Sequence, residues 1–92
     1  MALWMTWELE EVGRAAQAVD SVDEAARWLV GSAERSKRAF DVEWRWQRLM
    51  DSVLRLRARM LDEGRESLAR GTSWSGVDEG VEVRLTVRRG RG

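Results

Sequence analysis

The chain contains no cysteine, histidine, proline or tyrosine among its 92 residues. Without cysteine there can be no disulfide, thiolate nucleophile or cysteine metal site, and without histidine the commonest neutral-pH acid–base group and zinc ligand is missing. Neighbouring acids such as Asp62 and Glu63 fit ordinary helix ion pairs, because Arg59 lies four residues before Glu63. We therefore expect no enzyme activity, no catalytic or metal site, no cofactor and no small-molecule substrate.

Long apolar runs are also absent. No uncharged run is longer than residues 1–7, which are far fewer than the ~20 residues that a bilayer requires and lack the flanks of a signal peptide. We expect a cytoplasmic chain that makes no membrane contact, with residues 1–92 forming one small domain. A domain of this length buries only roughly 60–65% of its unfolded surface, so partner surfaces become plausible stabilisers.

The formal net charge is zero, but the charges are unevenly placed. Residues 1–24 hold six acids and one base, a net of −5, whereas residues 25–61 hold nine bases and four acids, a net of +5. Docking the first segment on the second would neutralise both, either within one chain or between two copies. Residues 84–92 add four arginines and no acid.

Residues 1–31 fit an acidic helical segment. The apolar positions of this segment recur at the 3–4 spacing of a helical packing stripe, with Met5, Val12, Val19 and Ala26 seven residues apart. Thr6 suits the N-cap of a helix that starts at about residue 7. Ser21 with Glu24 fits a capping box, which would make the segment two short helices that meet near Asp20. Gly31-Ser32 is expected to end it.

Residues 33–63, within a segment spanning 32–70, carry the strongest helical signal, because neither proline nor glycine interrupts them. A helix of this length would extend about 46 Å and exceed a compact domain of this size. Part of it would project, pair with another copy, or lie on a partner. Its apolar residues alternate four and three apart and form the predicted helix interface: Val42, Trp46, Leu49, Val53, Leu56 and Met60.

A second contact surface is predicted from large apolar side chains that lie off this seam. Tryptophan is enriched at interface hot spots, and the chain has six. The residues assigned to the surface are Phe40, Trp44, Leu54, Leu61 and Trp74.

Residues 71–80 form a turn region rich in glycine and serine, and residues 81–88 alternate as a half-buried strand does. The residues assigned to strand pairing are Val81, Val83, Leu85 and Val87. Three mates remain open: residues 72–77 across a turn at 78–80, the segment 3–7 at the start of the chain, or another subunit.

The last arginines are candidate contacts to an acidic partner or to nucleic acid: Arg84, Arg88, Arg89 and Arg91. Phosphate contacts by arginine would dominate nucleic-acid binding. The neutral net charge and the absence of a recognition-helix signature argue against that alternative.

Together these patterns predict a mainly α fold with a small β element: a helical hairpin with one long amphipathic helix and a C-terminal strand. The predicted function is that of a non-enzymatic structural or protein-protein interaction subunit in a homo- or hetero-oligomeric assembly, as a phage-like particle component or an adaptor or inhibitor. The alternative is a small dimeric nucleic-acid-binding regulator that uses arginines of the helix and the C-terminal tail.

Overall fold

The computed structural model describes residues 2–88. Two β-hairpins flank a helical segment in the order β-β-α-α-β-β. The elements are β1 (Ala2–Leu9), β2 (Gly13–Val19), α1 (Val22–Arg35), the 3₁₀ turn η1 (Lys37–Ala39), α2 (Glu43–Arg59), the π turn η2 (Met60–Gly64), α3 (Arg65–Ala69), β3 (Trp74–Asp78) and β4 (Val81–Arg88).

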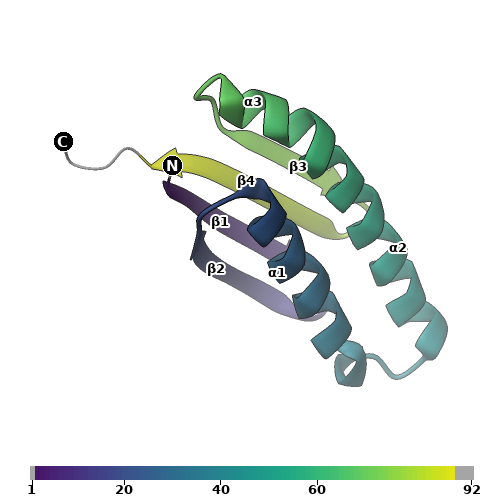
Figure 1. Ribbon diagram of the computed structural model, residues 1–92. Helices are drawn as coiled ribbons and strands as arrows, with labels where there is room; N and C mark the ends of the chain where they lie inside the picture. The colour runs from purple at the N-terminus through teal and green to yellow at the C-terminus, as the bar shows by residue number, and fades with distance from the viewer. Residues whose placement is uncertain (1, 89–92) are drawn as a thin grey trace.

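The four strands form one antiparallel sheet in the order β2-β1-β4-β3. The first and last strands pair in its centre along their whole length, from Ala2 opposite Arg88 to Leu9 opposite Val81. Both helical segments lie on one face of this sheet, and Figure 1 shows no element on the other face. The described chain is therefore a two-layer α/β structure with an open sheet face.

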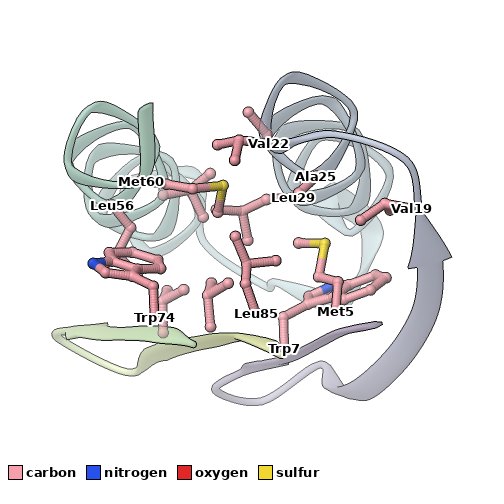
Figure 2. Close-up of a cluster of buried hydrophobic side chains, with 14 of the residues drawn as sticks. Met5, Trp7, Val19, Val22, Ala25, Leu29, Leu56, Met60, Trp74 and Leu85 are labelled. Carbon is pink, nitrogen blue, oxygen red and sulfur yellow. The ribbon is translucent and has the colours of Figure 1, made fainter. Parts of the chain in front are cut away.

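The core lies between the two layers. Odd-numbered residues of β1 point toward the helices, and Leu3, Met5, Trp7 and Leu9 are each at most 6% exposed. They meet buried residues of α1, α2 and η2, as Figure 2 shows for Leu29, Leu56 and Met60. The alternation along β1 is the period of a strand with one buried face.

The expected mainly α helical hairpin is wrong: residues 2–19 are a β-hairpin, and the fold has a four-stranded sheet. The seven-residue apolar spacing that indicated a helix joins residues of different elements: Met5 lies on β1, Val12 in the turn after it, Val19 at the end of β2 and Ala26 on α1. The alanines of β2 favour helix in isolation, but the pairing of the whole strand with β1 outweighs that preference.

The helix boundaries also differ from those expected. Helix α1 begins after Ser21, whose hydroxyl accepts from the Glu24 N–H at 3.1 Å, and continues through Gly31. It ends at Arg35, where the Ser36 hydroxyl donates to the Ala33 carbonyl at 2.7 Å. The predicted helix over residues 33–63 is thus interrupted between α1 and α2. Because of this interruption, α1 and α2 run antiparallel to each other and both pack an apolar face on the sheet. One straight helix could not place two apolar faces side by side.

Past Arg59 the helix continues through η2 and α3 up to Ala69, so Gly64 does not end it. The position instead leaves room for a side chain. A Cβ at Gly64 would lie 3.3 Å from the Trp74 ring, and a Cβ at Gly76 would lie 2.8 Å from it. The Trp74 indole fills the space that two glycines leave between η2 and β3.

The expected C-terminal strand is β4. Two of the three candidate partner segments pair with it, one along each edge. It lies between β3 and β1, so both of its edges are hydrogen-bonded within the chain. Gly80, with φ of +86°, forms the turn between β3 and β4. Within residues 2–88, no helix is both long and apolar enough to cross a membrane.

Candidate protein interaction site

Trp44 is the most exposed tryptophan in the described chain, with 54% of its surface accessible. It lies in the first turn of α2, and Figure 1 shows that the start of this helix extends beyond the end of the sheet. Two guanidinium groups flank its ring: Arg45 at 5.7 Å and Arg48 at 6.0 Å from the centroid. A large rigid ring between two cations is typical of a protein contact, since tryptophan and arginine dominate interface hot spots.

Trp46 fixes the start of α2 and so sets the direction of Trp44. Its indole N–H donates to the Ala33 carbonyl at 2.9 Å, and the Lys37 ammonium lies 5.0 Å from its ring centroid. Two residues along a helix turn a side chain by about 200°. Trp44 therefore points away from the α1–α2 contact that Trp46 makes.

A hollow of about 390 Å³ opens beside Trp44. Its walls come from the first half of α2, from Phe40 before that helix, and from the tips of both hairpins. The two tips are tied together by a hydrogen bond from the Glu10 N–H to the Gly80 carbonyl at 2.8 Å. Its lining residues are Glu10, Glu11, Phe40, Trp44, Arg45, Arg48, Leu49, Ser52 and Glu79.

The hollow carries charges of both signs. Glu11 lies 3.6 Å from Arg45, one contact between the acidic first segment and the basic middle within the chain. Arg48 forms no ion pair with any residue from 2 to 88. Val12, which follows Glu11 in the chain, and Val42, two residues before Trp44, are each 40% exposed. The site can therefore contact an apolar side chain and a charged group together.

An ion pair holds the β3–β4 turn beside the hollow. Arg55 donates to Asp78 from Nη2 at 2.7 Å and from Nε at 3.0 Å, and its Nη2 also reaches Glu79 at 3.3 Å. The hydrogen bond from Arg55 lowers the pKa of Asp78, although partial burial opposes that effect. The same bond raises the pKa of Arg55. Both groups are thus held charged across the neutral range.

The structure places the predicted helix interface mostly in the core of the chain. Leu49, Val53, Leu56 and Met60 are at most 6% exposed and face the sheet and α1. Trp46 is half-buried against this core, and Val42 is exposed before α2 begins. Four of the six seam residues are therefore occupied by contacts within the chain.

The predicted second contact surface is divided. Phe40 and Trp44 share the hollow, whereas Trp74 is buried under η2. Leu54 is 42% exposed on α2, and Leu61 is half-buried on η2, where it shares a surface hollow with residues of α1. The structure brings together two of these five residues and adds Arg45, Arg48 and the hairpin tips. Sequence reasoning missed the tip between β1 and β2 because it assigned residues 1–31 to helix.

The strand-pairing residues Val81, Val83 and Leu85 are buried toward the helices, and Val87 is half-buried at the edge of the core. Arg84 and Arg88 point to the open sheet face, where the Arg88 guanidinium lies 4.5 Å from the Trp4 ring centroid. Arg89 and Arg91 lie outside the described residues.

Trp4 is a surface residue that sequence reasoning missed. It is half-buried on the open face, between Ala18 on β2 and Thr86 on β4. This face carries charges of both signs. Arg14 lies 3.5 Å from Glu8, and Glu82 on β4 lies opposite Glu8. The alternation of residues along β1 with a period of two was the signal that could have predicted a strand here, with Trp4 on its outer face.

Within residues 2–88, no three acidic side chains converge on a point where a metal ion could sit. Comparisons with protein-family models, with curated proteins and with solved structures found no match. What the geometry defines is a two-layer α/β protein with an exposed Trp–Arg hollow at one end and an open sheet face.

Proposed function

We propose that the chain is a non-enzymatic interaction subunit of an oligomeric assembly, and that the Trp44 hollow binds another protein subunit. The assembly is cytoplasmic or a particle built in the cytoplasm. The observation that carries the proposal is the 54% exposure of Trp44 between two arginines. Leaving so much apolar surface in water gains nothing for a free monomer, whereas a partner that covers it gains the burial of the ring.

The shape and chemistry of the hollow support a protein partner. Its volume of about 390 Å³ accommodates one or two side chains. Arg48 is available to a carboxylate of the partner, and Glu10, which forms no ion pair within residues 2–88, is available to a cation. Such mixed polar groups around an apolar anchor are typical of an interface core and its rim.

The proposal is tested by placing a photo-reactive amino acid at position 44 in the full chain, expressed in its source cells. We expect one dominant cross-linked protein that is absent when the same probe replaces Leu54. Leu54 is a suitable control because it is exposed on the same helix and does not line the hollow. No adduct at position 44, or the same adducts at both positions, would contradict the proposal.

A second candidate is binding of single-stranded nucleic acid on the open sheet face. The specific observation is the stacking of Arg88 on Trp4, with Arg84 on the same strand. Exposed sheets that bind single strands stack bases on aromatic rings and contact phosphates with cations. Glu8 and Glu82 on the same face disfavour a phosphate backbone, so we rank this function second.

This candidate is tested by titrating a labelled single strand into wild type and Trp4→Ala at two salt concentrations. Binding that weakens steeply with salt and falls in Trp4→Ala supports nucleic-acid binding. Absence of binding at ~50 mM salt eliminates it, because phosphate contacts are strongest at low ionic strength.

A further inference from the structure

The two edges of the sheet are protected very differently. Edge strand β3 has five residues, and α2 covers it with arginines: Arg59 donates to the Val77 carbonyl at 3.3 Å, and Arg55 binds Asp78. Edge strand β2 has seven residues, and among the described residues the only side-chain hydrogen bond to its backbone comes from its own Gln17. Exposed edges without a cover, a proline or a lysine are ready to pair with another strand.

The residues of β2 suit pairing with a second copy of the same strand. Arg14 is its only charged residue, and all its residues except Gln17 and Val19 are exposed. An antiparallel pair centred on Ala16 places Ala16 opposite its own copy and Arg14 opposite Ala18. No like charges then face each other, and residues opposite one another share a face, so the two sheets join with their helices on the same side.

Helix α1 supplies a second, self-complementary contact beside this edge. Trp28 is half-buried, and its ring centroid lies 6.5 Å from that of Trp7. Trp7 on β1 lies opposite Ala15 on β2. Trp28 therefore flanks the helix side of β2. Glu24, Arg27 and Arg35 share one surface hollow with it, and Arg35 lies on the opposite side of Trp28 from Glu24 along α1. A two-fold axis through Ala16 sets the two α1 helices antiparallel, which turns the acid of one copy toward the base of the other.

We infer that two copies of the chain pair through β2 to form one continuous eight-stranded antiparallel sheet. The inference deepens the proposed function by naming one partner, a second copy, but it uses a surface separate from the Trp44 hollow. The assembly unit is then a two-fold dimer with two Trp44 hollows. Each hollow lies beside the start of α2, at the end of the sheet where the two hairpins turn. Arg88 lies at the other end of the central strands.

The register centred on Ala16 gives a charge-swap test. In sedimentation experiments at micromolar concentration we expect wild type to be a dimer, and Ala16→Lys and Ala16→Glu each to be monomers, because like charges face each other across the axis. An equimolar mixture of the two variants should restore a dimer containing one copy of each. Ser75→Lys and Ser75→Glu are matched controls on the same face of the other edge, and they should remain dimeric.

A wild-type chain that stays monomeric would overturn the inference, as would charged variants that dimerise like wild type or a mixture that stays monomeric. Circular dichroism of each variant separates loss of pairing from loss of folding. If both variants unfold, hydrogen exchange of wild type decides: protection of all β2 amides supports pairing, and rapid exchange of every second amide contradicts it. Trp44→Ala leaves this dimer intact, so failure here is distinct from failure of the proposed function.

Discussion

Arg55 and Asp78 join α2 to the end of β3 by two hydrogen bonds, from Nη2 to Oδ1 at 2.7 Å and from Nε to Oδ2 at 3.0 Å. Arg55 also contacts the Ser52 hydroxyl at 3.2 Å. Such two-point arginine–carboxylate pairs are geometrically specific. This one covers the β3 edge of the sheet and holds Glu79 at the rim of the Trp44 hollow.

Asp78→Asn should lower the free energy of unfolding at pH 7, because the neutral amide loses the charge-assisted bond. The pKa of Asp78 is lowered in the fold, chiefly by the hydrogen bond from Arg55. Its contribution to stability is therefore complete above the unfolded-state pKa of about 3.9 and is lost as pH falls through the lower folded-state pKa.

Urea unfolding of wild type and Asp78→Asn across this pH range measures the effect. The difference in unfolding free energy between the two proteins should be constant at neutral pH and should disappear in acid. Asp62→Asn, at an exposed position on η2, is the control and should match wild type throughout. A difference for Asp78→Asn that persists unchanged in acid would show that the carboxylate charge is not its cause.

Leu56→Ala should lower the free energy of unfolding by about 2–5 kcal/mol, the usual cost of removing a buried leucine side chain. Leu56 is fully buried on α2 against Trp74 and the sheet (Figure 2). Leu54→Ala, two residues away and 42% exposed, should change it by no more than about 0.5 kcal/mol. Equal effects in chemical denaturation would contradict the placement of this seam in the core of a single chain.

Gly76→Ala should lower the free energy of unfolding by about 1–3 kcal/mol through overpacking. A Cβ there would lie 2.8 Å from the Trp74 ring and 2.9 Å from a methyl of Leu56. Ser75→Ala on the neighbouring exposed position provides the comparison and should be nearly neutral. Wild-type stability for Gly76→Ala would mean that Trp74 does not occupy the space above this glycine.

The parts of the fold that could be predicted are those with one strong local pattern. The strict alternation from Val81 to Arg88 predicted β4, and the Ser21–Glu24 capping pattern predicted a helix start. The seam from Leu49 to Met60 identified buried residues, but periodicity alone cannot say whether the covering surface is the same chain or another.

The first hairpin could not be predicted in the same way, because its second strand has no strand pattern of its own. The sequence Gly13–Val19 is rich in alanine and becomes a strand by pairing with β1. The turn that joins them requires positive φ at Glu11, +67°, and at Gly13, +132°. A glutamate at such a position gives no turn signal. Without this hairpin, the position of Glu10 and Glu11 at the Trp44 hollow could not be predicted.

Of the residues assigned to the second contact surface, Phe40 and Trp44 line one hollow, whereas Trp74 is buried, and the sequence did not separate Trp74 from the other two. All are large aromatic residues outside the main seam. What distinguishes Trp74 is the pair Gly64 and Gly76, which are distant in sequence and close in space. Only the packing of η2 on β3 reveals that they make room for one ring.

The most direct test of the central claim is the affinity of the protein cross-linked at position 44 for wild type and for Trp44→Ala, measured by titration calorimetry. Loss of a hot spot costs at least about 2 kcal/mol, so we predict a dissociation constant raised about 30-fold or more, with the thermal stability of the chain unchanged. Leu54→Ala should bind as wild type does. Undiminished binding by Trp44→Ala would contradict the assignment of this hollow as the interaction site.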